Sequence, residues 1–192
     1  MFFRKAAIRP IPRWAVVEED AVLAVEAMLE LSDEAFEQTM ERAYRQMKER
    51  QPTLTTWLVA QFTLHENELV QSVAFFLAVS VYMAFREAFP TRLQTIDAAQ
   101  LELAIETFIT DESIRQEDPI EVMETDDIIA VGQPAVVHFI QSHVDEAIGQ
   151  AGENPPLDAF DHVYRSLLVE VVALSHAVSP PHGLPESNRW LA

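Results

Sequence analysis

The side chains best suited to chemistry in this sequence are six histidines and a small number of carboxylates. The histidines are spread along the chain: His65, His138, His143, His162, His176 and His182. Helical bundles that bind two metal ions place a histidine three residues after a glutamate on each of two helices. None of the six histidines has a glutamate at that spacing, and the His-Glu-x-x-His pattern is also absent. A metal site would therefore have to gather residues that are distant in the sequence.

Glu170 has the most unusual surroundings of any carboxylate, because it lies in the apolar run LLVEVVAL. Burial without a partner would raise the pKa of its side chain and suit it to acid or base chemistry. Pairing with Arg165, Arg86 or a histidine would make it a structural polar contact instead, and it could also face water. No nucleophile or second acid is placed nearby by the sequence, so a structural role is favoured.

The remaining carboxylate candidates lie beside His65, where His-Glu-Asn-Glu begins a predicted helix. Asn67 and the two glutamates are better explained as helix caps than as ligands. If the protein binds a metal, the candidate ligands are His65, Glu66, Glu170 and His176. The acidic segment 111–127 lacks the spacing and the glycine of a calcium-binding EF-hand, and we interpret it as a solvated loop.

Enzyme signatures are missing from the sequence. There is no Gly-x-Ser-x-Gly elbow and no Walker or Rossmann glycine pattern. With only four glycines in 192 residues, loops that cradle phosphates are difficult to build. The sequence therefore favours a protein that is not an enzyme, and it predicts no cofactor.

Charge and cysteine content narrow the class of partner and compartment. The formal net charge is −18, and residues 93–192 hold 18 acidic against 3 basic side chains. Such a surface repels nucleic acid and anionic membranes, whereas a basic protein would be attracted. The chain has no cysteine, which fits a reducing compartment, so a cytoplasmic location is expected.

The elements that must position these side chains are predicted to be helices. Residues 69–85 carry no charge, and a helix that is apolar on nearly every side must be surrounded by protein or by lipid. The run only just reaches the length of a membrane span, and Lys and Arg do not cluster beside it. We therefore predict that a helix over 68–89 forms the centre of a soluble bundle.

Amphipathic spacing and proline positions predict the neighbouring helices. They are expected at 17–31, 33–50, 53–63, 96–110, 134–148 and 157–177, with Thr95 as the cap of the fourth of these. The expected fold class is all-α, a single-domain bundle of about seven helices. Residues 1–16 would form a basic N-terminal arm, residues 17–178 the helical domain, and residues 179–192 a proline-rich tail.

A weak internal similarity is centred on Gln51-Pro52 and Gln133-Pro134. Four apolar positions after each dipeptide match at an offset of 82, and each helix is followed by a longer apolar one. The similarity could record two related helical halves. It could equally be the chance agreement of two amphipathic helices opened by proline, which is the slightly favoured interpretation.

The function favoured by these observations is a non-catalytic helical protein that acts through protein–protein contacts, most simply as a homodimer. Trp14 and Trp190 lie beside prolines in the two terminal arms, and such aromatic residues often anchor on another subunit. Packing of the same residues into grooves of their own chain is about as well supported. The alternative function is a helical bundle that binds a metal or a small molecule through His and Glu side chains.

Overall fold

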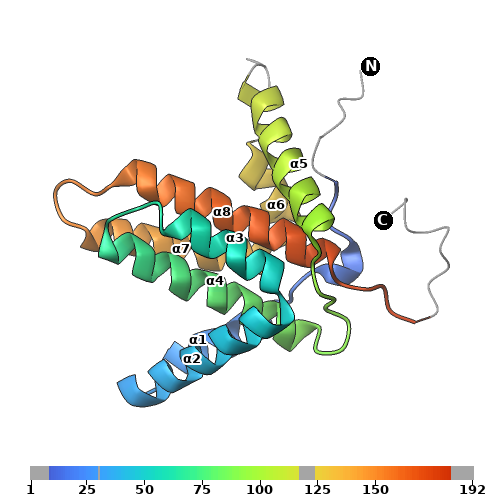
Figure 1. Cartoon of the computed structure of the whole chain (residues 1–192), viewed down its shortest axis with the longest axis horizontal. Helices are drawn as coiled ribbons and strands as arrows, with labels where there is room; N and C mark the ends of the chain where they lie inside the picture. Colours follow the sequence, from blue (N-terminus) through green and yellow to red (C-terminus); the bar gives the residue numbers. More distant parts are fainter. Residues whose placement is uncertain (1–8, 30, 117–123, 183–192) are drawn as a thin grey trace.

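The computed structural model describes residues 9–29, 31–116 and 124–182, and these residues form an all-α bundle (Figure 1). A short 3-10 turn, Arg13–Ala15, precedes eight α-helices. The helices are α1 (Glu19–Leu29), α2 (Asp33–Arg50), α3 (Pro52–Phe62), α4 (Glu68–Ala88), α5 (Ala98–Gln116), α6 (Thr125–Gly132), α7 (Pro134–Gln150) and α8 (Leu157–His176). The predicted fold class is therefore confirmed.

Helix α4 is the core helix that the sequence predicted. Every residue from Leu77 to Phe85 is buried, and the helix contacts α1, α2, α3, α7 and α8. It is long and apolar enough to cross a membrane by length and composition, and no other helix in the described ranges is. Its apolar middle is enclosed by neighbouring helices, which is how a soluble bundle covers such a helix.

Helix α8 shares the centre with α4, although the sequence placed it among the surrounding helices. Every residue from Ser166 to Ser175 is buried, including Glu170. The two helices pack directly on each other. After them, Leu93 and Val178 form an isolated antiparallel bridge, so the chain segments that leave the two helices also lie side by side.

Helix α5 is longer than the sequence indicated, and Thr95 does not cap it. The cap is Asp97, whose Oδ1 accepts a hydrogen bond from the backbone N–H of Gln100 at 2.8 Å. Residues 111–116 continue the helix instead of joining a solvated loop. Asp111 is 1% exposed and accepts hydrogen bonds from Arg115 and Thr125. These partners allow a carboxylate to be buried that the sequence assigned to solvent.

Two buried glutamines hold the bundle together in the same way. Each one directly precedes a proline at the first position of a helix. The backbone angles of the two glutamines are similar: φ −130°, ψ 55° at Gln51 and φ −138°, ψ 60° at Gln133. Each side-chain amide donates to one backbone carbonyl and accepts from the backbone N–H two residues later: Gln51 binds Gln94 and Ile96, and Gln133 binds Ala15 and Val17. The donor–acceptor distances lie between 2.6 and 2.8 Å.

The two glutamines relate the halves of the chain. The segment 15–17 leads into α1, and the segment 94–96 leads into α5. Exchanging the first four helices with the last four maps the main helix contacts onto one another. The contact of α1 with α4 corresponds to that of α5 with α8, the contact of α2 with α3 to that of α6 with α7, and the contact of α4 with α7 to that of α8 with α3. The central α4–α8 contact maps onto itself. Figure 1 shows α1 and α2 on one side of the central helices and α5 and α6 on the other.

The described helices therefore group into two four-helix units with corresponding contacts, an arrangement that fits the two related halves, which the sequence offered as the less favoured interpretation. Gln51 belongs to the first unit but binds the opening segment of the second, and Gln133 binds the opening segment of the first. The units are interlocked by this exchange.

Candidate functional site

Two histidines from distant parts of the chain meet in the structure. His65 lies in the turn between α3 and α4, and His162 lies in the second turn of α8. His65 Nε2 and His162 Nδ1 are 2.8 Å apart, so one nitrogen must donate a proton and the other must accept it. Burial, followed by the charge of His65, lowers the pKa of His162. This histidine pair joins the start of α4 to α8 and requires at least one neutral ring.

The other candidate metal ligands do not join the histidine pair. Glu66 is exposed, and Asn67 caps α4 by accepting a hydrogen bond from the backbone N–H of Val70 at 3.1 Å. His176 lies at the end of α8, and burial, followed by the positive charge of Arg9, lowers its pKa. Within the described ranges, no three or more His, Asp or Glu side chains come together as a metal site would require.

Glu170 is completely buried in the middle of α8. Neither carboxylate oxygen has a hydrogen-bond partner among the described residues. Two cations considered as partners bind other groups, since Arg165 pairs with Glu112 and Arg86 donates to Gln46. Burial raises the pKa of Glu170 well above its usual range. The raised pKa alone does not make Glu170 a catalytic acid, because a substrate cannot reach a side chain with no exposed surface.

Trp14, an interface candidate, packs against its own chain. It is partly buried, and its indole N–H donates to the backbone carbonyl of Val178 at 3.2 Å. Arg92 donates to the carbonyl oxygens of Trp14 and Ser179 at 3.3 and 3.2 Å. The segment before α1 is thus attached to the segments that follow α4 and α8. Trp190 lies outside the described residues, so its role at an interface stays a prediction.

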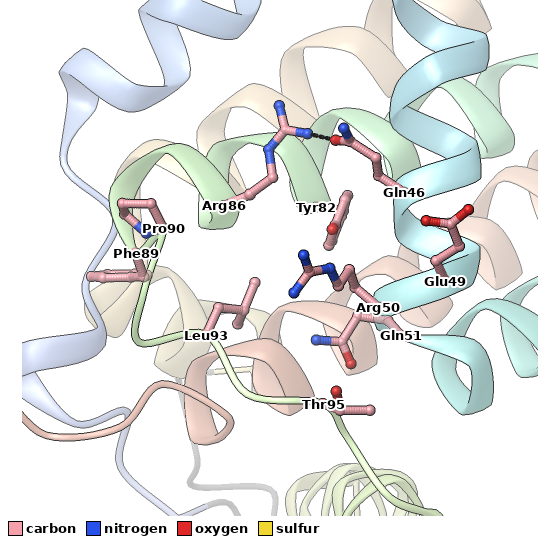
Figure 2. A pocket seen from close by; sticks show the side chains of 10 residues that line it. All are labelled: Gln46, Glu49, Arg50, Gln51, Tyr82, Arg86, Phe89, Pro90, Leu93 and Thr95. Carbon is pink, nitrogen blue, oxygen red and sulfur yellow. Dashed lines mark hydrogen bonds between the residues drawn. The ribbon is translucent and has the colours of Figure 1, made fainter.

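A pocket that the sequence did not indicate opens where α2 and α4 end. Its volume is about 350 Å³. We call it the α2–α4 pocket. Its lining consists of Gln46, Glu49, Arg50, Gln51, Tyr82, Arg86, Phe89, Pro90, Leu93 and Thr95. Figure 2 shows the Arg50 guanidinium between Tyr82 and Leu93, with Arg86 and Gln46 joined above it. The size is in the range of small-molecule sites.

The charges of this pocket differ from those of the chain as a whole. Arg50 makes no hydrogen bond or ion pair with any described residue, and the hydrogen bond of Arg86 goes to the neutral amide of Gln46. Tyr82 is 2% exposed. Burial raises the pKa of its hydroxyl, and the nearby charges of Arg86 and Arg50 oppose that shift. The pocket therefore presents two cations and a protonated phenol together, with the carboxylate of Glu49 also in its lining.

The sequence could not reveal this grouping. Arg50 and Arg86 stand in the last turns of two helices, where they suit the negative ends of the helix dipoles, and nothing in their types or spacing links them. Tyr82 follows the uncharged run and looks like an ordinary core residue. The pocket arises because α2 and α4 end at the same place and the chain after Phe89 passes between their ends.

Comparisons of the chain with protein-family models, with curated proteins and with solved structures find no match.

Proposed function

We propose that this is a non-catalytic helical protein that binds a small molecule in the α2–α4 pocket. The observation that carries the proposal is the pair Arg50 and Arg86, which face one cavity and have no carboxylate partner. Arg86 is partly buried and Arg50 is exposed at the mouth of the pocket, so a ligand between them would meet guanidinium N–H groups that no protein carboxylate occupies.

This proposal can be tested by NMR with a collection of small molecules in which acids, bases and neutral compounds are equally represented. Compounds that bind in the pocket should shift the resonances of Tyr82, Leu93 and Thr95. Their binding should weaken in the variant Arg50→Gln and persist in Arg45→Gln, which removes an exposed arginine from the same helix. If no compound perturbs the pocket resonances, the proposed function is wrong.

Contact with another protein, as a homodimer, remains the second candidate, and the outer face of α5 favours it. Leu103 and Ile114 are 46% and 44% exposed, and they share this face with Thr107 and Thr110. These four side chains are uncharged in a chain of net charge −18, and Glu106 borders them between Leu103 and Thr110. Two copies of an acidic protein would meet with the least repulsion there. A basic protein partner would use the charged faces instead.

The dimer hypothesis is tested by light scattering after size-exclusion chromatography. We expect a dimer for the natural chain and a monomer for Leu103→Glu combined with Ile114→Glu. A monomer for the natural chain would remove this candidate. A cytoplasmic location belongs to the same proposal, supported by the absence of cysteine and by the covering of α4 by other helices.

A further inference from the structure

We infer that the ligand of the α2–α4 pocket is a compact organic anion, a carboxylate or a phosphate monoester with an apolar body. This inference rests on the proposed small-molecule function and names the chemical class of the ligand. It follows from the free donors of the pocket, from the apolar wall opposite them, and from a difference between the two units of the fold.

The free donors come from three side chains. None of the N–H groups of Arg50 donates a hydrogen bond to a described residue. Arg86 donates one hydrogen bond, from Nη1 to the side-chain oxygen of Gln46. Guanidinium groups match the planar, two-oxygen geometry of carboxylates and phosphates. The Tyr82 hydroxyl makes no hydrogen bond with any described residue, and it stays protonated because burial raises its pKa. It adds a neutral donor aimed at the same space.

The acidic residue in the lining does not neutralise the arginines. Glu49 is exposed, and no ion pair within 4.0 Å joins it to Arg50 or Arg86. Figure 2 shows Glu49 and Arg86 on opposite sides of Tyr82, and the charge of Glu49 adds to the raised pKa of the Tyr82 hydroxyl. The helix dipoles account for arginines at the ends of α2 and α4. They do not supply protein acceptors for the guanidinium N–H groups, which are left to solvent at the exposed Arg50 and are available to an anion.

The opposite wall favours an apolar body on the ligand. Phe89, Pro90 and Leu93 line the side of the pocket away from α2. A cavity of about 350 Å³ holds a small ring with one anionic group and leaves little space for a nucleotide or a peptide. A bare inorganic ion would leave this wall without a contact.

The second unit shows that the fold does not require such a pocket. Arg50 directly precedes Gln51, and the residue that directly precedes Gln133 is Gly132. Ile11 packs onto this glycine so closely that an added Cβ would lie 2.9 Å from the Ile11 side chain. The corresponding place is therefore filled by the segment before α1. At this position the first unit has an arginine beside a cavity, and the second unit has a glycine covered by Ile11.

The test compares pairs of probes that differ in charge and hardly in shape. NMR titrations are run with benzoate and benzamide, with phenyl phosphate and phenol, and with inorganic phosphate. We expect benzoate or phenyl phosphate to bind at least about tenfold more tightly than its neutral partner, because a hydrogen-bonded charge contributes that much. The variants Arg50→Gln and Arg86→Gln should each abolish this preference, Tyr82→Phe should reduce it, and Arg45→Gln should leave it unchanged.

The outcomes separate the inference from the proposed function. Equal binding of charged and neutral probes at the pocket would overturn the anion inference and leave the small-molecule function standing. Failure of every probe and of the wider collection to reach the pocket would overturn both. Binding of phenyl phosphate without benzoate, or the reverse, supports the inference and selects the anionic group. Circular dichroism of each variant establishes that the lost preference does not come from unfolding.

Discussion

Glu170 shows at the scale of one residue how burial changes a carboxyl group. Its side chain has no exposed surface and no hydrogen-bond partner among the described residues, and burial raises its pKa well above the usual range. The unfolded chain ionises near the ordinary pKa, so it releases its proton at a lower pH than the folded protein does. Glu170 therefore makes the folded state less stable as the pH rises from about 4.5 towards the folded pKa.

We predict that Glu170→Gln removes this pH-dependent loss and that Glu170→Met also removes the unpaired polar group. The methionine variant should be more stable than the natural protein at pH 7 by about 1–3 kcal/mol. Urea unfolding between pH 4.5 and 8 measures both effects. The gain of Glu170→Gln over the natural protein should increase with pH. A gain that does not depend on pH would show that the carboxyl group is not the cause.

The histidine pair has the opposite dependence on pH. The pKa of His162 is lowered in the folded protein, so its stabilising contribution is complete above the unfolded pKa of about 6.5 and is lost as the pH falls. The contribution should be below about 1 kcal/mol, since the pair is only partly buried and solvent screens it.

We predict that His162→Gln has a smaller loss of stability between pH 7.5 and 5 than the natural protein. The matched control is His138→Gln, which changes an exposed histidine on α7. Urea unfolding at several pH values measures the difference. If both variants show the same dependence on pH as the natural protein, the contact between His65 and His162 does not contribute to stability.

At the scale of the elements, the two glutamines explain how helices far apart in the sequence are joined. Gln133 is 0% exposed and also donates to Ser175 Oγ at 2.9 Å. A leucine at this position would leave the Ala15 carbonyl and the Val17 N–H buried without partners. Each such group costs about 1–3 kcal/mol.

We predict that Gln133→Leu lowers the free energy of unfolding by about 2–4 kcal/mol, and that Gln51→Leu has an effect of similar size. Gln150→Leu, at the exposed end of α7, serves as the control and should change stability by less than about 0.5 kcal/mol. Thermal and urea unfolding measure all three variants. A negligible effect of both buried substitutions would contradict the role assigned to the glutamines.

The elements themselves were largely predictable, whereas their partners were not. Proline at position 52 or 134 and the spacing of apolar residues locate the starts of α3 and α7 to within a residue. The dipeptide Gln51-Pro52 was visible in the sequence, but the side chain of Gln51 binds backbone groups 43 and 45 residues away. Every residue type except proline carries the same backbone N–H and C=O groups, so the sequence does not indicate which of them a side chain will bind. The α2–α4 pocket was hidden for the same reason, because it depends on where two helix ends and a loop meet.

At the scale of the whole molecule, the interlocked units should unfold together. The central contact is made by α4 of one unit and α8 of the other, and each unit holds the opening segment of its neighbour through a glutamine. Within the first unit alone, the apolar surface of α4 that faces α7 and α8 would be exposed to water. A helix that is apolar on nearly every side is not stable in that state.

We predict that a fragment of residues 1–97, which contains the first unit and the segment bound by Gln51, does not fold alone. Circular dichroism should show less helix than in the same residues of the whole chain and no cooperative thermal transition, because the fragment lacks the α8 surface that covers α4. The whole chain should unfold in one transition, with the same midpoint by circular dichroism and by tryptophan fluorescence. A fragment that melts cooperatively with full helix content would mean that the two units are independent domains. Mixing it with residues 98–192 gives a second test, because only interlocked units would recover helix on mixing.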